Sequence, residues 1–424
     1  MAVSFLRHEV SDLCLGKPAL RSLSISATVA DAVEALRTSE DNFISVWDCN
    51  HHSKSLAGDL CRCVGKVCMV DVICYLSNDE NLSSPSAPLK APVSEILTKI
   101  PGTVMHVEPS CRSTNYPAKT KLLTQFTLFH SLLQAIDLIL QGNQNLVVPI
   151  QTRLSSTLRR KQFPKSTNQM ATTTNHNGQE FCWLTQEDVI RFLLSSIGVF
   201  SPMPALSIDS LGIINTTDIL AINYHSPASS AVQLITQSLE QQTSVAVVDS
   251  DDVLIGEISP FTLACCDESV AAAIATLSCG ELMSYIDCGG PPEHLIKIVT
   301  ERLKERKLKR ALENYSSLMN ASANSVSSSS SSSSSDEESS VSSSSSKLRS
   351  AGRFSRSNSY SARMVRRSEA IVCHPKSSLV AVMIQAIAHR VNYVWVIEDD
   401  YNLVGVVTFT GMLEVFREHL ETMI

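Results

Sequence analysis

The apolar residues of this chain follow two kinds of spacing that alternate along its length. Four stretches have the period near 3.6 that is typical of a helix, and each begins at a Ser or Thr: 28–36, 131–140, 230–239 and 378–388. Thr28 and Asp31 also have the spacing of a capping box, in which each side chain bonds the other residue's backbone N–H. The pattern predicts four helices with defined N-termini.

Short continuous apolar runs follow these helices and predict buried strands at 43–47, 146–150, 245–248 and 394–397. After each comes a second strand that runs directly into another helix. The four strand-to-helix junctions are Gly65-Lys66-Val67-Cys68-Met69-Val70-Asp71, Phe181-Cys182-Trp183-Leu184-Thr185-Gln186-Glu187-Asp188, Gly256-Glu257-Ile258-Ser259-Pro260-Phe261-Thr262 and Gly405-Val406-Val407-Thr408-Phe409-Thr410-Gly411. One helix, strand, strand, helix unit is therefore predicted to occur four times.

A Ser-rich segment interrupts this repeating pattern. Residues 322–346 contain 18 Ser among 25 residues, and residues 347–368 carry seven basic residues and no acidic one. Such a composition has too few apolar groups to form a core. We expect residues 321–368 to be a disordered insert between ordered parts of the chain.

Composition narrows the class of protein. In 424 residues, 44% are hydrophobic and 18% charged, which excludes a collagen-like or wholly disordered chain. The net charge of −7 argues against a nucleic-acid coat protein. The chain has 13 Cys without a CxxC pair, no signal-peptide pattern and no apolar run of about 20 residues. We expect reduced thiols and a soluble protein in the cytoplasm or nucleus that binds neither nucleic acid nor membranes.

The four junctions resemble those of the cystathionine-β-synthase (CBS) domain, whose units end in Gly-x-x-Ser/Thr-x-x-Asp between the last strand and the last helix. Two further runs are similar to plant four-CBS-domain proteins of the CBSX type, which are distantly similar to the γ subunit of AMP-activated protein kinase. These runs are Ser11-Asp12-Leu13-Cys14-Leu15-Gly16-Lys17-Pro18 and Ser368-Glu369-Ala370-Ile371-Val372-Cys373-His374-Pro375-Lys376-Ser377-Ser378.

The resemblance implies an α+β fold of four β-α-β-β-α repeats, paired one with two and three with four into two Bateman modules. It places the repeats at 15–80, 95–198, 205–268 and 369–424, with a helical linker at 269–320. It also implies clefts for adenosine nucleotides and a regulatory role toward a protein partner such as a kinase subunit. Self-association into a homodimer is a further alternative.

The residue types at each junction suit nucleotide binding on physical grounds. A helix N-terminus attracts phosphate, a Ser or Thr hydroxyl adds a hydrogen bond, and an Asp carboxylate accepts from ribose hydroxyls. Only the second junction has both groups, in Thr185 and Asp188; the others keep Asp71, Ser259 or Thr408 alone. These five residues are the predicted ligand-binding set, with Thr185 and Asp188 first. The alternative is that Ser/Thr-x-x-Asp is only an ordinary helix cap.

Residues 112–130 form an insertion within the second repeat, between its first strand and its first helix. They represent either a gene-model artefact or a loop specific to this lineage. A separate amphipathic stretch at 293–315 predicts one helix that packs on its own domain rather than on a partner.

The sequence gives weaker evidence for metal binding and for catalysis. Cys49, His51, His52, Cys61 and Cys63 cluster near one loop, but Cys61 and Cys63 are too close for a zinc ligand pair, so no metal is predicted. No motif of a nucleophile elbow, glycine-rich phosphate loop or metalloprotease helix occurs, so we expect no enzyme and no cofactor.

The basic run contains Arg356 three residues before Ser359 and is a predicted kinase target at Ser355, Ser357 and Ser359. Two functions follow from these observations. The first is a non-catalytic regulator that binds AMP, ADP or ATP and modulates a partner. The alternative is a phosphorylation-controlled interaction scaffold whose clefts hold no ligand.

Overall fold

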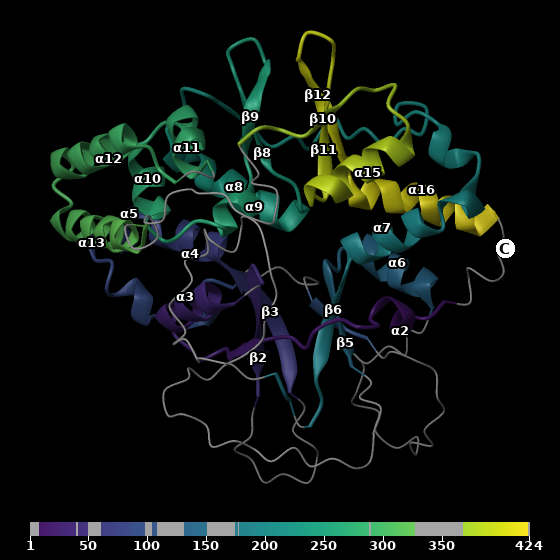
Figure 1. Ribbon diagram of the computed structural model, residues 1–424, viewed down its shortest axis with the longest axis horizontal. Helices are drawn as coiled ribbons and strands as arrows, with labels where there is room; N and C mark the ends of the chain where they lie inside the picture. The colour runs from purple at the N-terminus through teal and green to yellow at the C-terminus, as the bar shows by residue number, and fades with distance from the viewer. Residues whose placement is uncertain are drawn as a thin grey trace, which may run out of the picture.

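Four small sheets of identical topology organise the structure, which is a computed structural model describing residues 8–39, 41–49, 61–97, 104–107, 131–150, 174–176, 178–287, 290–326 and 368–422. In each sheet the first strand is parallel to the second and the third is antiparallel to the second (Figure 1). A helix joins the first two strands, and another helix follows the third. The predicted α+β class and the four β-α-β-β-α units are confirmed.

The units occupy the following elements. Unit 1 contains β1 (Ser22–Ser24), α3 (Val29–Thr38), β2 (Phe43–Asp48), β3 (Arg62–Cys68) and α4 (Met69–Leu76). Unit 2 contains β4 (Val104–His106), α6 (Leu132–Leu140), β5 (Asn145–Pro149), β6 (Phe181–Thr185) and α7 (Gln186–Ser195). Unit 3 contains β7 (Ala221–Asn223), α8 (Val232–Gln241), β8 (Val245–Val248), β9 (Leu254–Ile258) and α9 (Pro260–Ala264). Unit 4 contains β10 (Val372–Cys373), α15 (Leu379–His389), β11 (Tyr393–Ile397), β12 (Leu403–Thr408) and α16 (Phe409–Thr422).

Further short elements connect these units. They are α2 (Val10–Leu13), α5 (Asp79–Ser83), the 3₁₀ turns η1 (Pro88–Lys90), η2 (Val93–Glu95), η3 (Ile197–Phe200), η4 (Met203–Ala205) and η5 (Ala228–Ala231), and the helices α10 (Val270–Thr276), α11 (Cys279–Ile286), α12 (Glu293–Glu305) and α13 (Lys309–Val326).

Local sequence chemistry explains where the predicted helices begin. The Thr28 hydroxyl accepts from the Asp31 N–H, and Asp31 Oδ2 accepts from the Thr28 N–H at 2.9 Å, which is the predicted capping box of α3. Ser131 and Gln134 form the same motif at α6. Each box satisfies backbone donors that the helix itself leaves open.

The sheets pack together in two pairs. Unit 1 meets unit 2 through an aromatic and apolar cluster containing Trp47, Val147 and Trp183. Unit 3 meets unit 4 through strands β9 and β11 and through backbone hydrogen bonds from the Leu254 N–H to the Tyr401 carbonyl at 3.1 Å and from the Leu403 N–H to the Asp252 carbonyl at 3.2 Å. This agrees with the predicted pairing of one with two and three with four.

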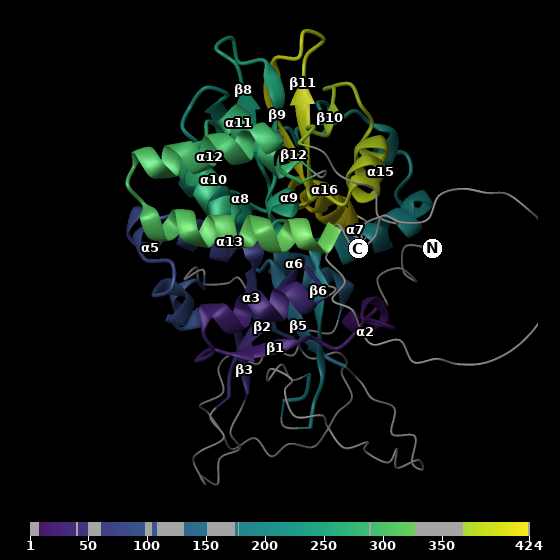
Figure 2. The same cartoon turned by 60° about the vertical axis from the view of Figure 1, so that its left-hand side comes forward.

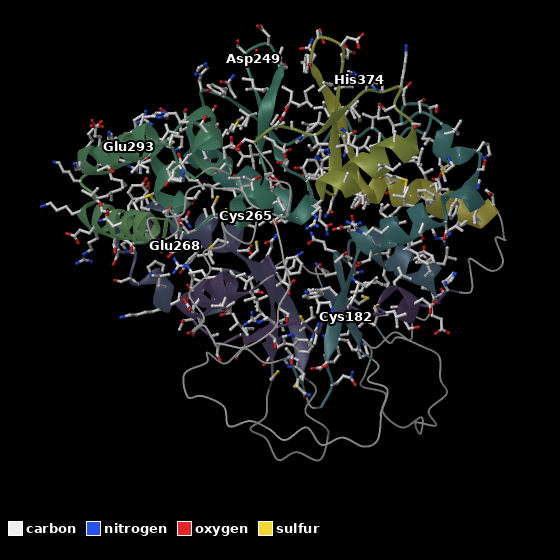
Figure 3. All side chains as sticks on the ribbon, viewed as in Figure 1. Cys182, Asp249, Cys265, Glu268, Glu293 and His374 are labelled. Atoms are coloured by element: carbon white, nitrogen blue, oxygen red, sulfur yellow. The ribbon has the colours of Figure 1, made fainter. Side chains whose placement is uncertain are left out.

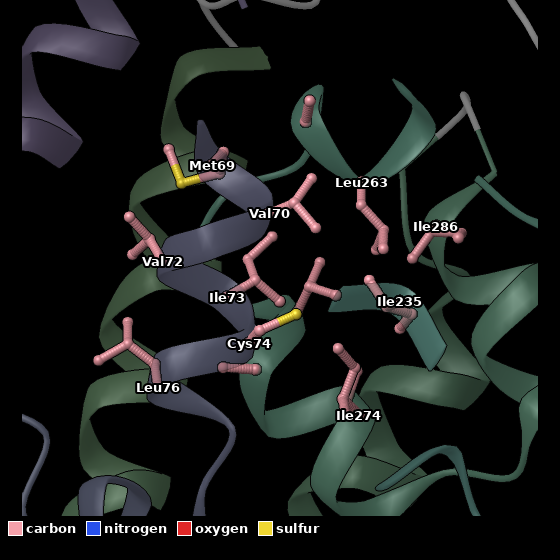
Figure 4. Packing of buried hydrophobic residues seen from close by; sticks show 14 of the residues in the cluster. Met69, Val70, Val72, Ile73, Cys74, Leu76, Ile235, Leu263, Ile274 and Ile286 are labelled. Atoms are coloured by element: carbon pink, nitrogen blue, oxygen red, sulfur yellow. The ribbon is translucent and has the colours of Figure 1, made fainter. Parts of the chain in front are cut away.

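Helices join the pair of units 1 and 2 to the pair of units 3 and 4, so the four units form a ring. One core cluster combines α3 and α4 with unit 3, and another combines α6 and α7 with unit 4. Figure 4 shows Val70, Ile73 and Cys74 of α4 directed toward Leu263 and Ile235 of unit 3. At the rim of this contact Arg37 of α3 pairs at 2.5 Å with Glu268, which lies in the turn between α9 and α10. Figure 3 labels Glu268.

Helices α12 and α13 form a hairpin, so the prediction of one helix at 293–315 was wrong (Figure 2). Lys307 adopts a left-handed conformation with φ 57°, and its N–H bonds the Lys304 carbonyl while the Leu308 N–H bonds the Leu303 carbonyl. This is a Schellman C-cap, which usually uses Gly at the left-handed position. Helix α12 packs on α10, and α13 packs on α5. The hairpin therefore packs on its own chain, as expected.

Helix α13 runs to Val326, so its last residues fall within the predicted insert at 321–368. Residues 327–367, with the predicted phosphorylation sites Ser355, Ser357 and Ser359, lie outside the described residues, as does the insertion 112–130. Among the described helices, none is long and apolar enough to span a membrane.

A buried carboxylate joins unit 3 to unit 4. Glu257 of β9 is 0% exposed and accepts from the Tyr393 hydroxyl at 2.9 Å and from the Trp395 indole N–H at 2.8 Å. Because both donors are also buried, removal of their shared acceptor would leave two unsatisfied polar groups.

We expect Glu257→Leu to lower the free energy of unfolding by about 2–5 kcal/mol, since buried donors without partners cost about 1–3 kcal/mol each. Tyr393→Phe should cost about 1 kcal/mol, because Glu257 keeps its bond from Trp395. Urea unfolding of the full chain measures both. A Glu257→Leu protein as stable as the parent would show that this network does not hold units 3 and 4 together.

Candidate functional site

A cavity of about 420 Å³ lies where the four units meet. Its walls include Lys66 from unit 1, Thr185 from unit 2, Ser259 from unit 3 and Tyr393 from unit 4. The volume is within the usual range for small-molecule sites. Of the five predicted ligand-binding residues, Thr185, Asp71 and Ser259 line this cavity, whereas Asp188 and Thr408 are not among its described lining residues.

The second junction forms a complete helix cap. Asp188 Oδ2 accepts from the Thr185 N–H and from the Thr185 hydroxyl, both at 2.8 Å. Lys17 Nζ pairs with the same carboxylate at 2.5 Å and donates to the Trp183 carbonyl at 2.8 Å. The Asp188 carboxylate is thus engaged by its own helix and by an N-terminal lysine, while Thr185 lies at the cavity wall.

The first junction places a carboxyl group on the cavity wall. Asp71 Oδ2 accepts from the Cys68 N–H at 2.7 Å. Burial raises the pKa of Asp71 and lowers the pKa of Lys66 two residues before the cap. Both shifts have the same cause, because removing a charged group from water disfavours its ionised form.

The remaining two junctions lack the carboxylate and satisfy fewer groups. The Ser259 hydroxyl accepts from the Phe261 N–H at 3.2 Å, and the Thr408 hydroxyl accepts from the Gly411 N–H at 3.2 Å. In the third junction Thr262 replaces Asp, and its buried hydroxyl has no partner among the described residues. These hydroxyls cap helices but do not form the reciprocal box seen at Thr185.

Charged side chains of both signs line the cavity. The basic ones are Lys66, Arg191 and Arg390, and the acidic ones are Asp71, Glu187 and Glu240. Arg191 is paired with Glu187 at 2.6 Å, whereas Lys66 Nζ donates to the neutral Asn145 amide oxygen at 3.4 Å. Among the described residues Lys66 forms no ion pair, so its ammonium group can pair with an anionic ligand.

Two helix N-termini open onto the same space. Cys68 and Thr185 are the N-cap residues of α4 and α7, and both line the cavity. The dipole and open N–H groups of a helix N-terminus favour anions. The Thr243 hydroxyl, on a residue 7% exposed at the cavity wall, has no hydrogen-bond partner in the described part of the chain. The site can accept an anionic ligand that also offers hydrogen-bonding groups.

The sequence did not single out Lys17, Lys66, Thr243 or Arg390. Lys66 stands inside the first junction, so attention to basic residues at the junctions would have found it. The others come from segments that are distant in sequence and reach the site only through packing of the units.

We expect Asp188→Ala to lower the free energy of unfolding by about 1–2 kcal/mol, because it removes a helix cap together with the partner of Lys17. Asp188→Asn should cost less, since its amide oxygen can still accept from the Thr185 N–H. Urea unfolding compares the two variants. Equal stability of Asp188→Ala and the parent would contradict a capping role.

Comparisons with known proteins were made on the whole chain. A family model described as the CBS domain matches residues 362–418. The CBS domain-containing protein CBSX5 of Arabidopsis thaliana is 50% identical over 428 residues, covering 99% of each chain. CBSX6 of the same plant is 28% identical, covering 97% of this chain and 94% of that protein.

One solved structure has the same arrangement of units at low sequence identity. It is a Methanocaldococcus jannaschii protein that has been proposed as an archaeal homologue of γ-AMPK, with a TM-score of 0.50 and 11% identity. The similarity covers 96% of this chain and 100% of the archaeal one, and at that identity it concerns the fold alone.

Proposed function

Because this chain belongs to the family of CBS domain-containing proteins, we propose that it is a non-catalytic regulator that binds an adenosine nucleotide and modulates a partner protein. The family membership agrees with the resemblance seen in the junctions. The proposed ligand site is the central cavity, and the proposed ligands are AMP, ADP and ATP.

The convergence of basic side chains and two helix N-termini on one cavity carries this proposal. Lys66 and Arg390 supply positive charge, and α4 and α7 direct the positive ends of their dipoles to the cavity wall. Charge-assisted hydrogen bonds to phosphate are roughly twice as strong as neutral ones. Thr185 and Thr243 add hydroxyls at the wall, and burial of the Thr243 hydroxyl without a partner favours a ligand that bonds it.

The junction carboxylates take different roles in this proposal. Asp71 lies at the cavity wall, and its proposed role is to accept from ribose hydroxyls. Asp188 holds Thr185 in its cap and keeps Lys17 in place. Its effect on the ligand is therefore positional.

Regulation would follow from the ring of units. A ligand in the cavity contacts residues of all four units, so it favours the arrangement in which those residues converge. A partner that binds the same arrangement more tightly is then coupled to the nucleotide. A kinase subunit is the proposed partner class, based on the γ-AMPK-like fold.

The scaffold alternative has one observation in its favour. The Thr185 N–H, the Thr185 hydroxyl and Lys17 Nζ all contact the same Asp188 oxygen, Oδ2. A scaffold would bind its partner equally well with and without nucleotide, and phosphorylation at Ser355, Ser357 and Ser359 would control that binding.

We expect calorimetric titration of AMP, ADP and ATP to show binding to the full chain, and Lys66→Met to weaken it about 10- to 150-fold. That range corresponds to about 1.5–3 kcal/mol, the usual contribution of a hydrogen bond to a charged group. Lys297→Met is the matched control, because Lys297 pairs with Glu293 on the surface of α12.

Two outcomes would contradict nucleotide binding in the central cavity. No heat with any of the three nucleotides would support the scaffold alternative. Binding that Lys66→Met and Lys297→Met leave equally unchanged would place the nucleotide outside the central cavity.

Nucleotide affinity should also depend on pH through Lys66. Burial lowers the pKa of Lys66, and a bound phosphate would raise it again, so binding takes up a proton. Affinity should therefore fall as pH rises through the pKa of Lys66 in the ligand-free protein. Titrations from about pH 8 upward, where phosphate is already ionised, test this. The parent protein should show the decline, and Lys66→Met should show a flat profile; parallel profiles would exclude Lys66 as the phosphate contact.

A further inference from the structure

Three possible metal ligands meet at the far end of the β2–β3 hairpin. Cys49 directly follows β2, Cys61 directly precedes β3, and His176 comes from unit 2 just before β6. The two sulfurs and a ring nitrogen of His176 all lie within 4.8 Å of one another. Units 1 and 2 thus contribute together to one cluster of soft donors.

The spacing of these atoms is close to that of a zinc site. Zn–S bonds of about 2.3 Å and Zn–N bonds of about 2.1 Å at a tetrahedral angle place S and N about 3.6 Å apart. The observed distance from Cys49 Sγ to His176 Nδ1 is 3.4 Å. The Cys61 sulfur lies within 4.8 Å of the Cys49 sulfur and of a ring nitrogen of His176, near enough to complete a Cys₂His set.

The histidine is already oriented for this role. His176 is 4% exposed, its ring stacks on the Trp47 indole with centroids 3.6 Å apart, and its Nε2 lies 2.9 Å from the Ser22 hydroxyl. With the proton on Nε2 donated to Ser22, the Nδ1 lone pair faces Cys49. Metal-binding histidines usually hold the second ring nitrogen in this way.

The neighbouring groups that resemble ligands are engaged elsewhere. Cys63 is buried, and its thiol donates to the Gly65 carbonyl at 3.4 Å. His106 Nε2 accepts from the Cys63 N–H at 3.0 Å. The short spacing of Cys61 and Cys63 had argued against a metal, but the structure pairs Cys61 with Cys49 and takes the third donor from another unit. His51 and His52 lie outside the described residues.

We propose that Cys49, Cys61 and His176 bind one Zn²⁺ ion that fastens unit 1 to unit 2. Two thiolates and one imidazole are typical zinc donors, and the three described ligands leave the fourth tetrahedral position to a further ligand. The ion would fasten the two units together, and this proposal does not rest on the nucleotide proposal. Its ligands come from both units, so it stabilises the sheet pair only when the two units are together.

The test is metal analysis of the full chain purified under reducing conditions and then titrated with Zn²⁺. We expect about one zinc per chain in the parent and less than about a tenth of that in Cys49→Ser, Cys61→Ser and His176→Asn. Cys266→Ser is the matched control, because Cys266 is a partly buried thiol outside units 1 and 2. The Cys266→Ser protein should bind as much zinc as the parent. Ser22→Ala should lower zinc affinity about 10- to 100-fold without abolishing binding.

A spectroscopic readout on the parent protein does not depend on how the variants fold. Co²⁺ added in place of zinc should give the thiolate charge-transfer and tetrahedral ligand-field bands expected of a Cys₂His site. Absence of both zinc and these bands would overturn the proposal. So would copper in place of zinc, or zinc retained equally by the three ligand variants.

Discussion

The need to cover the open face of each three-stranded sheet determines the architecture of this protein. A sheet of three strands with helices on one side cannot keep large apolar side chains on its other face in water. Trp47 and Trp395 are 1% and 0% exposed because a second sheet covers each of them. Without its partner unit, each indole would face solvent, so the units must pair.

Because the paired sheets cover one another, the helices of each unit pack against helices of the other pair. Units 1 and 3 share one core and units 2 and 4 share another, which closes a ring. Three of the four strand-to-helix junctions reach its centre, with polar and charged groups such as Lys66, Thr185 and Ser259. A cavity remains where the four units meet, lined by these groups together with apolar side chains such as Phe43, Leu97 and Phe261.

The features that could be predicted from the sequence are those that short local patterns determine. Caps such as Thr28 with Asp31 fix helix starts from four neighbouring residues, and the four-fold recurrence identified the units. The break at Lys307 was missed because the apolar stripe continues on both sides and the left-handed position carries Lys instead of Gly. The engagement of Asp188 by Lys17 depends on how the N-terminal segment packs against β6, which no local pattern records.

The β2–β3 hairpin connects the two proposed ligand sites. Phe43 and Cys68 at one end of its strands line the central cavity, while Cys49 and Cys61 flank the other end. With about 3.3 Å per residue, the ladder between them spans roughly 20 Å, with a bulge between Val46 and Trp47. An ion that fixed the outer end of this hairpin against unit 2 would also restrict its inner end, where Lys66 and Cys68 lie. If zinc changes the affinity for nucleotide in this way, nucleotide changes the affinity for zinc by the same factor.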